Sequence, residues 1–308
     1  MNARRASLSL DLDNLWCYLR VQGDPEWQKL PCFLDRVVPQ VLTFFQERST
    51  TITVFVVGQD AALADRRDRL REIASAGHEI GNHSFGHEPA MAEASFTEVE
   101  RDIALAHETI ADATGIEPRG FRGPGFATSE AMLRVLRRRG YRYDASRVPT
   151  FVGPLARQYY FYAAKLSREE RRRRGALFGK WSDVLAPNRA HRVATPEGSL
   201  VEVPVTTMPL LRLPIHLSYV HYLDQIAPVV ARTYFATALD LCRATGTMPS
   251  LLLHPLDFLG GDDVPELRFF PGMRLEGERK RKATATFVDA FLKRFEGVPM
   301  AEHAAVVA

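Results

Sequence analysis

The sequence predicts an α/β fold and, within that class, a single (β/α) barrel. Short apolar runs alternate with longer segments of helical periodicity along most of the chain, which is typical of parallel sheets whose strands are joined by helices. Neither an internal repeat nor a Gly/Ser-rich linker interrupts this alternation, so we expect one domain over residues 1–308. A barrel is favoured over an open sheet, although the pattern by itself leaves both open.

The clearest strand and helix patterns lie in the first half of the chain. Apolar runs of strand length at 8–12 and 52–57 each precede a segment with helical periodicity. Ser95 and Glu98 form the pair that opens a helix with a capping box. In chain order we expect a strand at 8–12, a helix at 33–46, a strand at 52–57, a helix at 63–76, a strand at 78–82, a helix at 97–113, a strand near 120, a helix at 129–139 and a strand at 141–144.

The alternation breaks after Pro149, where we expect an insertion at about 151–195 that is rich in aromatic residues and arginine. Beyond it the β/α pattern resumes, and the second half of the domain completes the sheet. The expected elements are a strand at 200–206, a helix at 222–244, a strand at 251–253 and a helix at 277–295.

Composition excludes several classes of protein. With 46% hydrophobic and 25% charged residues, the 308-residue chain has ample material for a core, and 40 basic against 37 acidic side chains do not call for a nucleic-acid partner. Cys17, Cys32 and Cys242 are odd in number and widely spaced, which fits reduced thiols rather than a disulfide framework. No apolar run approaches the roughly 20 residues of a membrane span. We expect a cytoplasmic protein.

Asp11 and Asp13 stand two residues apart at the end of the first expected strand. Side chains alternate between the two faces of a strand, so both carboxylates point the same way if the strand continues through them. Two like charges side by side are costly to bury unless a cation lies between them or one of them acts as a base. A pair of solvated aspartates at a loop is the alternative.

His83 and His87 are four residues apart, a spacing that brings two imidazoles to one face of a helical turn. Gly81 and Gly86 argue against a long regular helix, so a turn or a helix start is expected. A lone histidine is more often structural. Two at this spacing, joined by one carboxylate, make a two-His, one-Asp site that leaves positions open for water and substrate.

Taken together, the ordered motifs resemble those of the polysaccharide deacetylase family, which is also called carbohydrate esterase family 4 and contains the NodB homology domain. The resemblance extends over residues 11 to 254, most of the chain. It rests on Asp11 and Asp13, His83 and His87, Arg122-Gly-Pro-Gly125, Asp144-Ala-Ser146, and Leu-Leu-Leu-His254-Pro.

This resemblance implies a distorted (β/α) barrel and a divalent metal, usually zinc but sometimes cobalt or another ion. It places the metal on Asp13, His83 and His87. Asp11 corresponds to the general base of the family and His254 to the acid that protonates the leaving amine. Both roles are chemically reasonable, since a metal lowers the pKa of water and a histidine can donate a proton near neutral pH.

Further site residues follow from the same resemblance. Arg122 matches the arginine that pairs with the base, although an ordinary salt bridge is the alternative for it. Gly125 replaces the aromatic residue common at that position, but its backbone N–H can still act as an oxyanion donor. Asp144 is a candidate to orient His254, and Glu202 is another; the sequence leaves both open.

The first motif departs from the usual Thr-Phe-Asp-Asp-Gly pattern, because Leu12 separates the two aspartates. This spacing resembles cytoplasmic members of the family, which include amidases of small amides and deacylases of lipid-linked sugars. We therefore expect a metal-dependent hydrolase that removes an acetyl or formyl group from an amino sugar. An allantoinase-like amidase and an inert binding protein with the same fold remain the alternatives.

The predicted insertion suggests a second interaction. Residues 151–181 interleave aromatic side chains with lysine and arginine, a composition that suits the surface of a membrane at the inner leaflet. Helices packed on the barrel with a solvated basic face are the stronger alternative. Nucleic-acid binding is not expected, since no recognised binding motif accompanies the short basic run.

Overall fold

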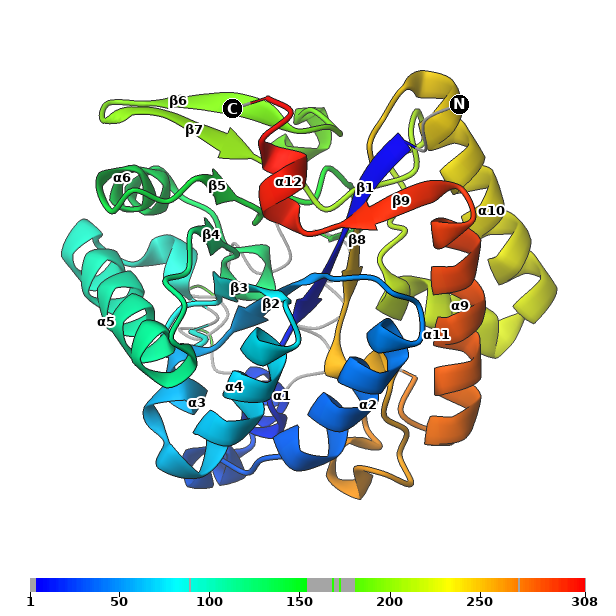
Figure 1. The fold of residues 1–308 in the computed structure, drawn as a ribbon, viewed down its shortest axis with the longest axis horizontal. Helices are drawn as coiled ribbons and strands as arrows, with labels where there is room; N and C mark the ends of the chain where they lie inside the picture. Colours follow the sequence, from blue (N-terminus) through cyan, green and yellow to red (C-terminus); the bar gives the residue numbers. More distant parts are fainter. Residues whose placement is uncertain are drawn as a thin grey trace.

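The computed structural model describes residues 4–88, 90–153, 168, 172, 181–270 and 272–307. At its centre lies a 9-stranded sheet in the order β6-β7-β5-β4-β3-β2-β1-β8, with β9 paired to β1 (Figure 1). The strand pairs are parallel except for β6 and β7, which run antiparallel. The strands are β1 (Arg4–Asp11), β2 (Thr53–Val56), β3 (Glu79–Asn82), β4 (Gly120–Phe121), β5 (Tyr143–Asp144), β6 (His191–Thr195), β7 (Gly198–Glu202), β8 (Ser250–Leu253) and β9 (Phe295–Val298).

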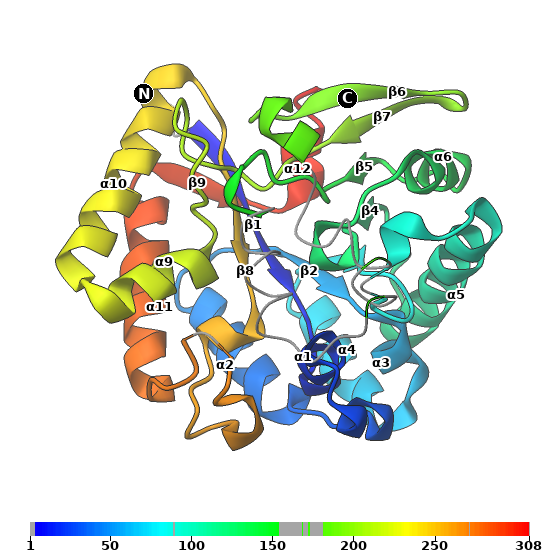
Figure 2. The same cartoon turned by 180° about the vertical axis from the view of Figure 1, so that it is seen from behind.

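The two ends of the sheet meet just beyond β7, which makes the sheet a distorted barrel. The Thr206 N–H donates to the Ser250 carbonyl at 3.1 Å, and the Ser250 N–H donates to Thr206 Oγ1 at 2.8 Å. These bonds join the extension of β7 to the start of β8. The antiparallel β6–β7 ribbon projects from this side of the barrel (Figure 2). The α/β barrel that the sequence predicts is therefore confirmed.

Helices surround the outer face of the sheet. In Figure 1, α9, α10 and α11 lie side by side on one flank, and α3, α4 and α5 lie on the other. The α-helices are α1 (Leu15–Gln22), α2 (Leu34–Gln46), α3 (Gly58–Ala62), α4 (Arg67–Ser75), α5 (Phe96–Thr114), α6 (Glu130–Arg138), α9 (Leu217–Ile226), α10 (Pro228–Thr245), α11 (Gly277–Leu292) and α12 (Met300–Ala304). The short 3₁₀ helices are η1 (Pro25–Lys29), η2 (Ala64–Arg66), η3 (Met91–Glu93), η4 (Pro124–Phe126), η5 (Trp181–Leu185), η6 (Pro255–Asp257) and η7 (Pro265–Leu267).

The side chains of β1 alternate between the outer and the inner face of the barrel. Leu8 and Leu10 face outward into the large core between sheet and helices, while Ser7, Ser9 and Asp11 face inward. The strand register carries this division around the sheet, because directly paired residues of neighbouring strands point to the same side. Asp11 pairs with Phe55, and Phe55 pairs with Gly81, so these three residues share the inner face.

Two glycines leave room for aromatic rings inside the barrel. A Cβ atom on Gly81 would overlap the ring of Phe55, and one on Gly120 would overlap the ring of Tyr143. Phe55 and Tyr143 are fully buried and pack with Met300, the first residue of α12. The interior is therefore filled, and α12 covers it at the end where β1 begins (Figure 1).

Most predicted elements lie within a few residues of the observed ones. The capping box of α5 is present, since Ser95 Oγ accepts from the Glu98 N–H and the Glu98 carboxylate accepts from the Ser95 N–H. The predicted helix at 222–244 is in fact α9 and α10, because Pro228 begins a second helix. The strand at 200–206 begins earlier and ends at Glu202.

Five of the described helices and strands were not predicted, namely α1, α3, β6, β9 and α12. Each is short. None of the residues of β6 is fully buried, and β9 has Glu296 and Gly297 at its centre. Neither strand has the apolar run of a buried strand, so periodicity gives no signal for them. β6 also falls inside the expected insertion at about 151–195, whose central part lies outside the described residues.

The proposed membrane contact through about 151–181 likewise falls almost entirely outside the described residues. In the part of the chain that the structure describes, none of the helices has both the length and the apolar character needed to cross a membrane.

Gly81→Ala should lower the free energy of unfolding by about 1–3 kcal/mol, because the new methyl group displaces the Phe55 ring inside a filled barrel. Urea denaturation measures the change. Gly86→Ala is the matched control, since its Cβ would lie 3.6 Å from the nearest side-chain atom and meet only ordinary contacts. Equal losses in the two variants would contradict the tight packing around Phe55.

Candidate active site

The predicted site residues meet at the carboxyl ends of the parallel strands. Asp11 ends β1, His83 follows β3, Arg122 follows β4 and His254 follows β8. Parallel strands present their carboxyl ends at one mouth of a barrel, so residues far apart in sequence become neighbours there.

Three donor atoms converge in this region. Asp13 Oδ1 lies 3.2 Å from His83 Nε2 and 2.9 Å from His87 Nε2. Donor atoms from all three buried residues lie within 4.8 Å of one another. Asp13 Oδ1 and His87 Nε2 are buried and have no hydrogen-bond partner among the residues that the structure describes. Electron-pair donors that converge without bonding to each other fit a cation, so these residues are suited to hold a divalent metal.

The electrostatics of the cluster also suit a cation. Burial raises the pKa of Asp13, but the charges of His87 and His83 outweigh it and hold the pKa well below its ordinary value. Burial lowers the pKa of His83, yet the charges of Asp11 and Asp13 raise it overall. Protons and a metal ion therefore compete for the same negative potential.

His83 is oriented through its other ring nitrogen. Its Nδ1 lies 2.6 Å from the carbonyl oxygen of Arg122, and because a carbonyl can only accept, Nδ1 carries the hydrogen. The Nε2 lone pair then faces Asp13. A backbone carbonyl that fixes the tautomer in this way is the usual support of a histidine metal ligand.

His87 is placed by a tight bend rather than by a helix. Ser84 and His87 adopt positive φ angles of 64° and 46°, which place both residues in the left-handed region. Asn82 Oδ1 accepts from the Ser84 N–H, and Ser84 Oγ accepts from the His87 N–H. The Asp102 carboxylate accepts from the two amides between them. The sequence analysis missed both Asn82 and Asp102 as supports of the bend.

Asp11 is held by a buried arginine. Arg122 Nη1 donates to Asp11 Oδ1 at 2.7 Å and to Ser9 Oγ at 2.9 Å, and Nε donates to the Ala145 carbonyl at 2.9 Å. The guanidinium lies 4.4 Å from the centroid of the Phe55 ring. The pairing of Arg122 with Asp11 that the sequence predicts is thus present, and it lies fully inside the protein.

His254 lies on the other side of Asp11. Its Nε2 is 3.9 Å from Asp11 Oδ2, which is also 4.0 Å from His83 Nε2. His254 Nδ1 lies 3.1 Å from Ser218 Oγ, which in turn lies 2.9 Å from Asp257 Oδ1. The sequence analysis missed both partners. The His-Pro-Leu-Asp pattern at 254–257 was a signal for Asp257, whereas nothing in the sequence pointed to Ser218.

Asp144 and Glu202 have a different place from the one the sequence suggested. Their Cα atoms are register partners of each other and of Phe121, a residue of the outer core, so both carboxyl groups point away from the barrel interior. In the described part of the chain no hydrogen bond joins either one to His254, whose Nδ1 is turned to Ser218. The structure therefore does not support Asp144 or Glu202 as the residue that orients His254.

Asp144 instead supports the turn after Arg122. Ser146 Oγ donates to Asp144 Oδ1 at 2.5 Å and accepts from the Gly123 N–H at 2.8 Å. Burial and the charge of Asp144 raise the pKa of Glu202 well above its ordinary value, so Glu202 keeps its proton beside Asp144. Through Ser146, Asp144 thus holds the backbone of Gly123 in the segment that leads to Gly125.

Gly125 lies in η4 with φ 57° and ψ 29°, a left-handed conformation that glycine adopts without strain. The next residue, Phe126, has a φ of 64° and places its ring 6.4 Å from that of His216. Burial and the charge of His254 lower the pKa of His216 to about 4, so its imidazole is neutral at neutral pH. The rings of Phe126 and His216 thus lie close to Gly125, the position at which the family commonly has an aromatic residue.

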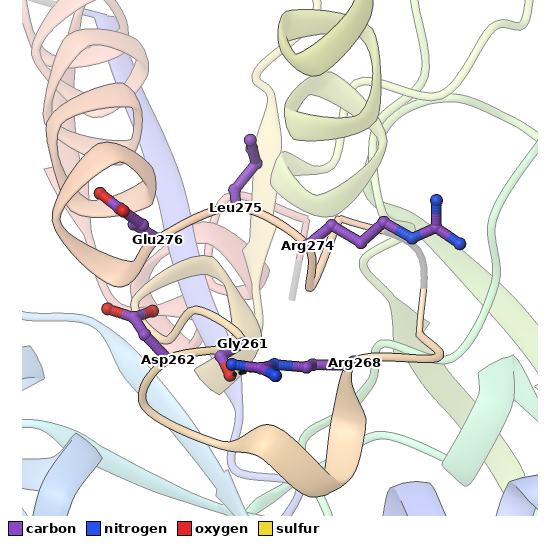
Figure 3. A pocket seen from close by; sticks show the side chains of 6 residues that line it. All are labelled: Gly261, Asp262, Arg268, Arg274, Leu275 and Glu276. Carbon is purple, nitrogen blue, oxygen red and sulfur yellow. Dashed lines mark hydrogen bonds between the residues drawn. The ribbon is translucent and has the colours of Figure 1, made fainter.

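A separate hollow of about 350 Å³ lies in the loop between β8 and α11. Figure 3 shows Asp262 and Glu276 on one side of it and Arg268 and Arg274 on the other. None of the predicted site residues lines it. Its mixed charges favour no single kind of ligand, so the candidate site remains the cluster at the barrel mouth.

Comparison with known proteins agrees with this geometry. Residues 27–143 match the family model described as polysaccharide deacetylase. This match confirms the resemblance to the polysaccharide deacetylase family. The matched segment contains His83, His87, Arg122 and Gly125, while Asp11, Asp13 and His254 lie outside it and are brought to the same place by the barrel.

Curated relatives match over about a third of the chain. A peptidoglycan deacetylase from Helicobacter pylori is 30% identical over 110 residues, which cover 35% of this chain and 36% of that protein. A chitooligosaccharide deacetylase from Azorhizobium caulinodans is 33% identical over 107 residues, which cover 34% of this chain and 50% of that protein. The chain thus spans between about a third and a half of the length of these polysaccharide deacetylase relatives.

Solved structures extend the likeness in fold to nearly the whole chain. A protein from Mycobacterium smegmatis, provisionally described as a polysaccharide deacetylase, has a TM-score of 0.61 at 17% identity over 98% of this chain and 90% of its own. One from Pseudomonas aeruginosa with the same provisional description has a TM-score of 0.59 at 15% identity over 98% and 90%. The distorted barrel is therefore the polysaccharide deacetylase fold.

Removal of one partner from the buried Arg122–Asp11 pair should be costly, because the other charge stays buried without compensation. We expect Arg122→Met to lower the free energy of unfolding by about 3–5 kcal/mol. The double variant Asp11→Asn/Arg122→Met should lose less than the sum of the single variants, with a coupling energy of about 1–3 kcal/mol from urea denaturation. Ser9→Ala, which removes a single hydrogen bond to Arg122, is the control. Additive losses would show that the pair is not coupled.

Proposed function

We propose that this chain is a divalent-metal-dependent hydrolase that removes an N-acyl group, acetyl or formyl, from an amino sugar. The convergence of Asp13, His83 and His87, with Asp11 and His254 beside them, carries the proposal. Its support from relatives is their description as deacetylases of peptidoglycan and of chitooligosaccharides.

Asp13, His83 and His87 would hold the cation. Two imidazoles and one carboxylate are a usual catalytic donor set for zinc, which we propose as the metal, and they leave coordination positions open. When bound, such a cation lowers the pKa of water and polarises the carbonyl of the scissile amide.

Asp11 is the proposed general base. Its Oδ2 faces the donor cluster 4.0 Å from His83 Nε2, while its Oδ1 accepts from Arg122. Arg122 therefore fixes the carboxylate and leaves one oxygen free to take a proton from the attacking water. The bond from the water oxygen to the acyl carbon forms in this step.

His254 is the proposed general acid. As the bond between the acyl carbon and the sugar nitrogen breaks, Nε2 of His254 gives its proton to that nitrogen, which leaves as an amine. The acid and the base are close enough to act on one substrate, since Nε2 lies 3.9 Å from Asp11 Oδ2. The backbone N–H of Gly125 is the proposed donor to the amide oxygen.

Measurements of metal content and of activity should distinguish the role of Asp13 as a metal ligand from that of Asp11 as the base. Wild-type protein is expected to contain about one divalent ion per chain and to lose acyl release after chelation, with recovery when zinc is restored. Asp13→Asn should bind the ion weakly because a ligand charge is lost. Asp11→Asn should keep the ion and release acetate or formate roughly 10²–10⁴-fold more slowly. Elemental analysis and acid-release assays measure both. An Asp11→Asn variant with full metal and wild-type activity would refute the assignment.

A panel of substrates should identify the class of amide. We expect turnover of N-acetyl or N-formyl amino sugars, offered as oligomers, nucleotide sugars and polyprenyl-phosphate-linked sugars, and little turnover of allantoin. Comparison of kcat/KM across the panel decides the matter. Preference for allantoin would replace the sugar proposal with a small-amide amidase. A protein that binds metal and sugar but turns over nothing would be a binding protein with this fold.

A further inference from the structure

The His254 imidazole is held by a chain of hydrogen bonds that starts in a different part of the barrel. Ser218, in the first turn of α9, places its Oγ 3.1 Å from His254 Nδ1 and 2.9 Å from Asp257 Oδ1. The other oxygen of Asp257 accepts from the His254 backbone N–H at 2.7 Å. Asp257 thus contacts His254 twice, once directly at the backbone and once through the hydroxyl of Ser218.

The direction of these bonds follows from what each group can donate. A carboxylate only accepts, so the Ser218 hydroxyl gives its hydrogen to Asp257. The lone pair of Ser218 Oγ is then left to accept from His254, which places a hydrogen on Nδ1. The opposite nitrogen, Nε2, is the one that faces Asp11. These hydrogen bonds therefore fix which ring nitrogen of His254 faces Asp11.

Asp257 is a firm anchor for this chain of bonds. It is 1% exposed, and its backbone carbonyl accepts from Thr284 Oγ1 at 2.7 Å. Thr284 lies on α11 and also contacts His221 Nε2 at 2.9 Å, so α9 and α11 are tied together behind the aspartate. Lys280, on the same helix, is 3% exposed and supplies positive charge that the carboxylate of Asp257 attracts.

We propose that Ser218 and Asp257 are positioning residues for the proposed acid, which they hold in the tautomer and orientation that present Nε2 to the leaving nitrogen. This inference rests on the proposed function. Neither residue touches the reacting atoms. Each acts through His254, in the way that hydrogen-bonded neighbours orient catalytic and metal-bound histidines in general.

The Ser218 hydroxyl stands between the Asp257 carboxylate and the His254 imidazole. A carboxylate in direct contact with an imidazole strongly stabilises the protonated ring, and an attraction of that kind weakens with distance. Ser218 passes on the orientation while it keeps the carboxylate out of contact with Nδ1.

The test compares Ser218→Ala with Ser218→Thr in the full-length, metal-loaded protein. Ser218→Ala should lower kcat for acyl release about 10–100-fold and change KM less than about twofold, because orientation of the acid is lost while the substrate contacts remain. Ser218→Thr keeps the hydroxyl and should restore most of the rate. Thr233→Ala, which removes a hydroxyl bonded within its own helix, is the control.

A second readout does not depend on turnover. In protein labelled with ¹⁵N at histidine, with the signals of His254 identified from the His254→Gln variant, the neutral ring should carry its hydrogen on Nδ1, and Ser218→Ala and Asp257→Asn should both shift it toward Nε2. An unchanged tautomer, or a changed tautomer with wild-type kcat in Ser218→Ala, would overturn the inference. If the tautomer changes as expected while wild-type protein hydrolyses none of the amides, the positioning stands and the proposed reaction falls.

Discussion

A buried ion pair between Arg122 and Asp11 organises the interior of this barrel. Both side chains are almost entirely withdrawn from water, and a charge in that position is tolerable only when its partner and further hydrogen bonds compensate it. Arg122 meets the requirement with Ser9, the carbonyl of Ala145 and the face of Phe55. Its own carbonyl also receives the Nδ1 hydrogen of His83. One residue therefore links the proposed base to the proposed metal ligands.

The position of the Arg122–Asp11 ion pair in turn depends on the side chains that pack inside the barrel. Phe55 can lie flat beneath the guanidinium because Gly81 has no side chain, and Tyr143 occupies the equivalent space beside Gly120. Met300 closes the interior from α12, with its sulfur 3.5 Å from Arg122 Nη2. Packing of this density leaves the arginine a single position. The geometry at the mouth of the barrel is thus set by residues that never approach a substrate.

Particular residues show how far the sequence could be interpreted. The β/α alternation predicted the α/β fold, and the resemblance to the polysaccharide deacetylase family implied one site made of Asp11, Asp13, His83, His87, Arg122 and His254. The structure explains why these residues meet, since the motifs follow parallel strands that end at one mouth. Asp144 was a harder case, since its role depends on which face of a two-residue strand it occupies, and only the register with Phe121 reveals that. Ser218 could not be predicted from the sequence. Its hydrogen bond to His254 depends on the packing of α9 against the barrel, which leaves no local sequence pattern.

The position of β1 has a consequence for how the chain folds. β1 precedes all of its partners in the sequence, and two of them, β8 and β9, lie more than 230 residues after it. Contacts over such long separations form slowly, and until they do the strand keeps an unpaired edge. During synthesis β1 must therefore wait until β8 and β9 have been made before these pairs can form. His254 joins Asp11 only when β8 takes its place, so the chain acquires its acid and base together late in folding, once the central strand is paired on both sides.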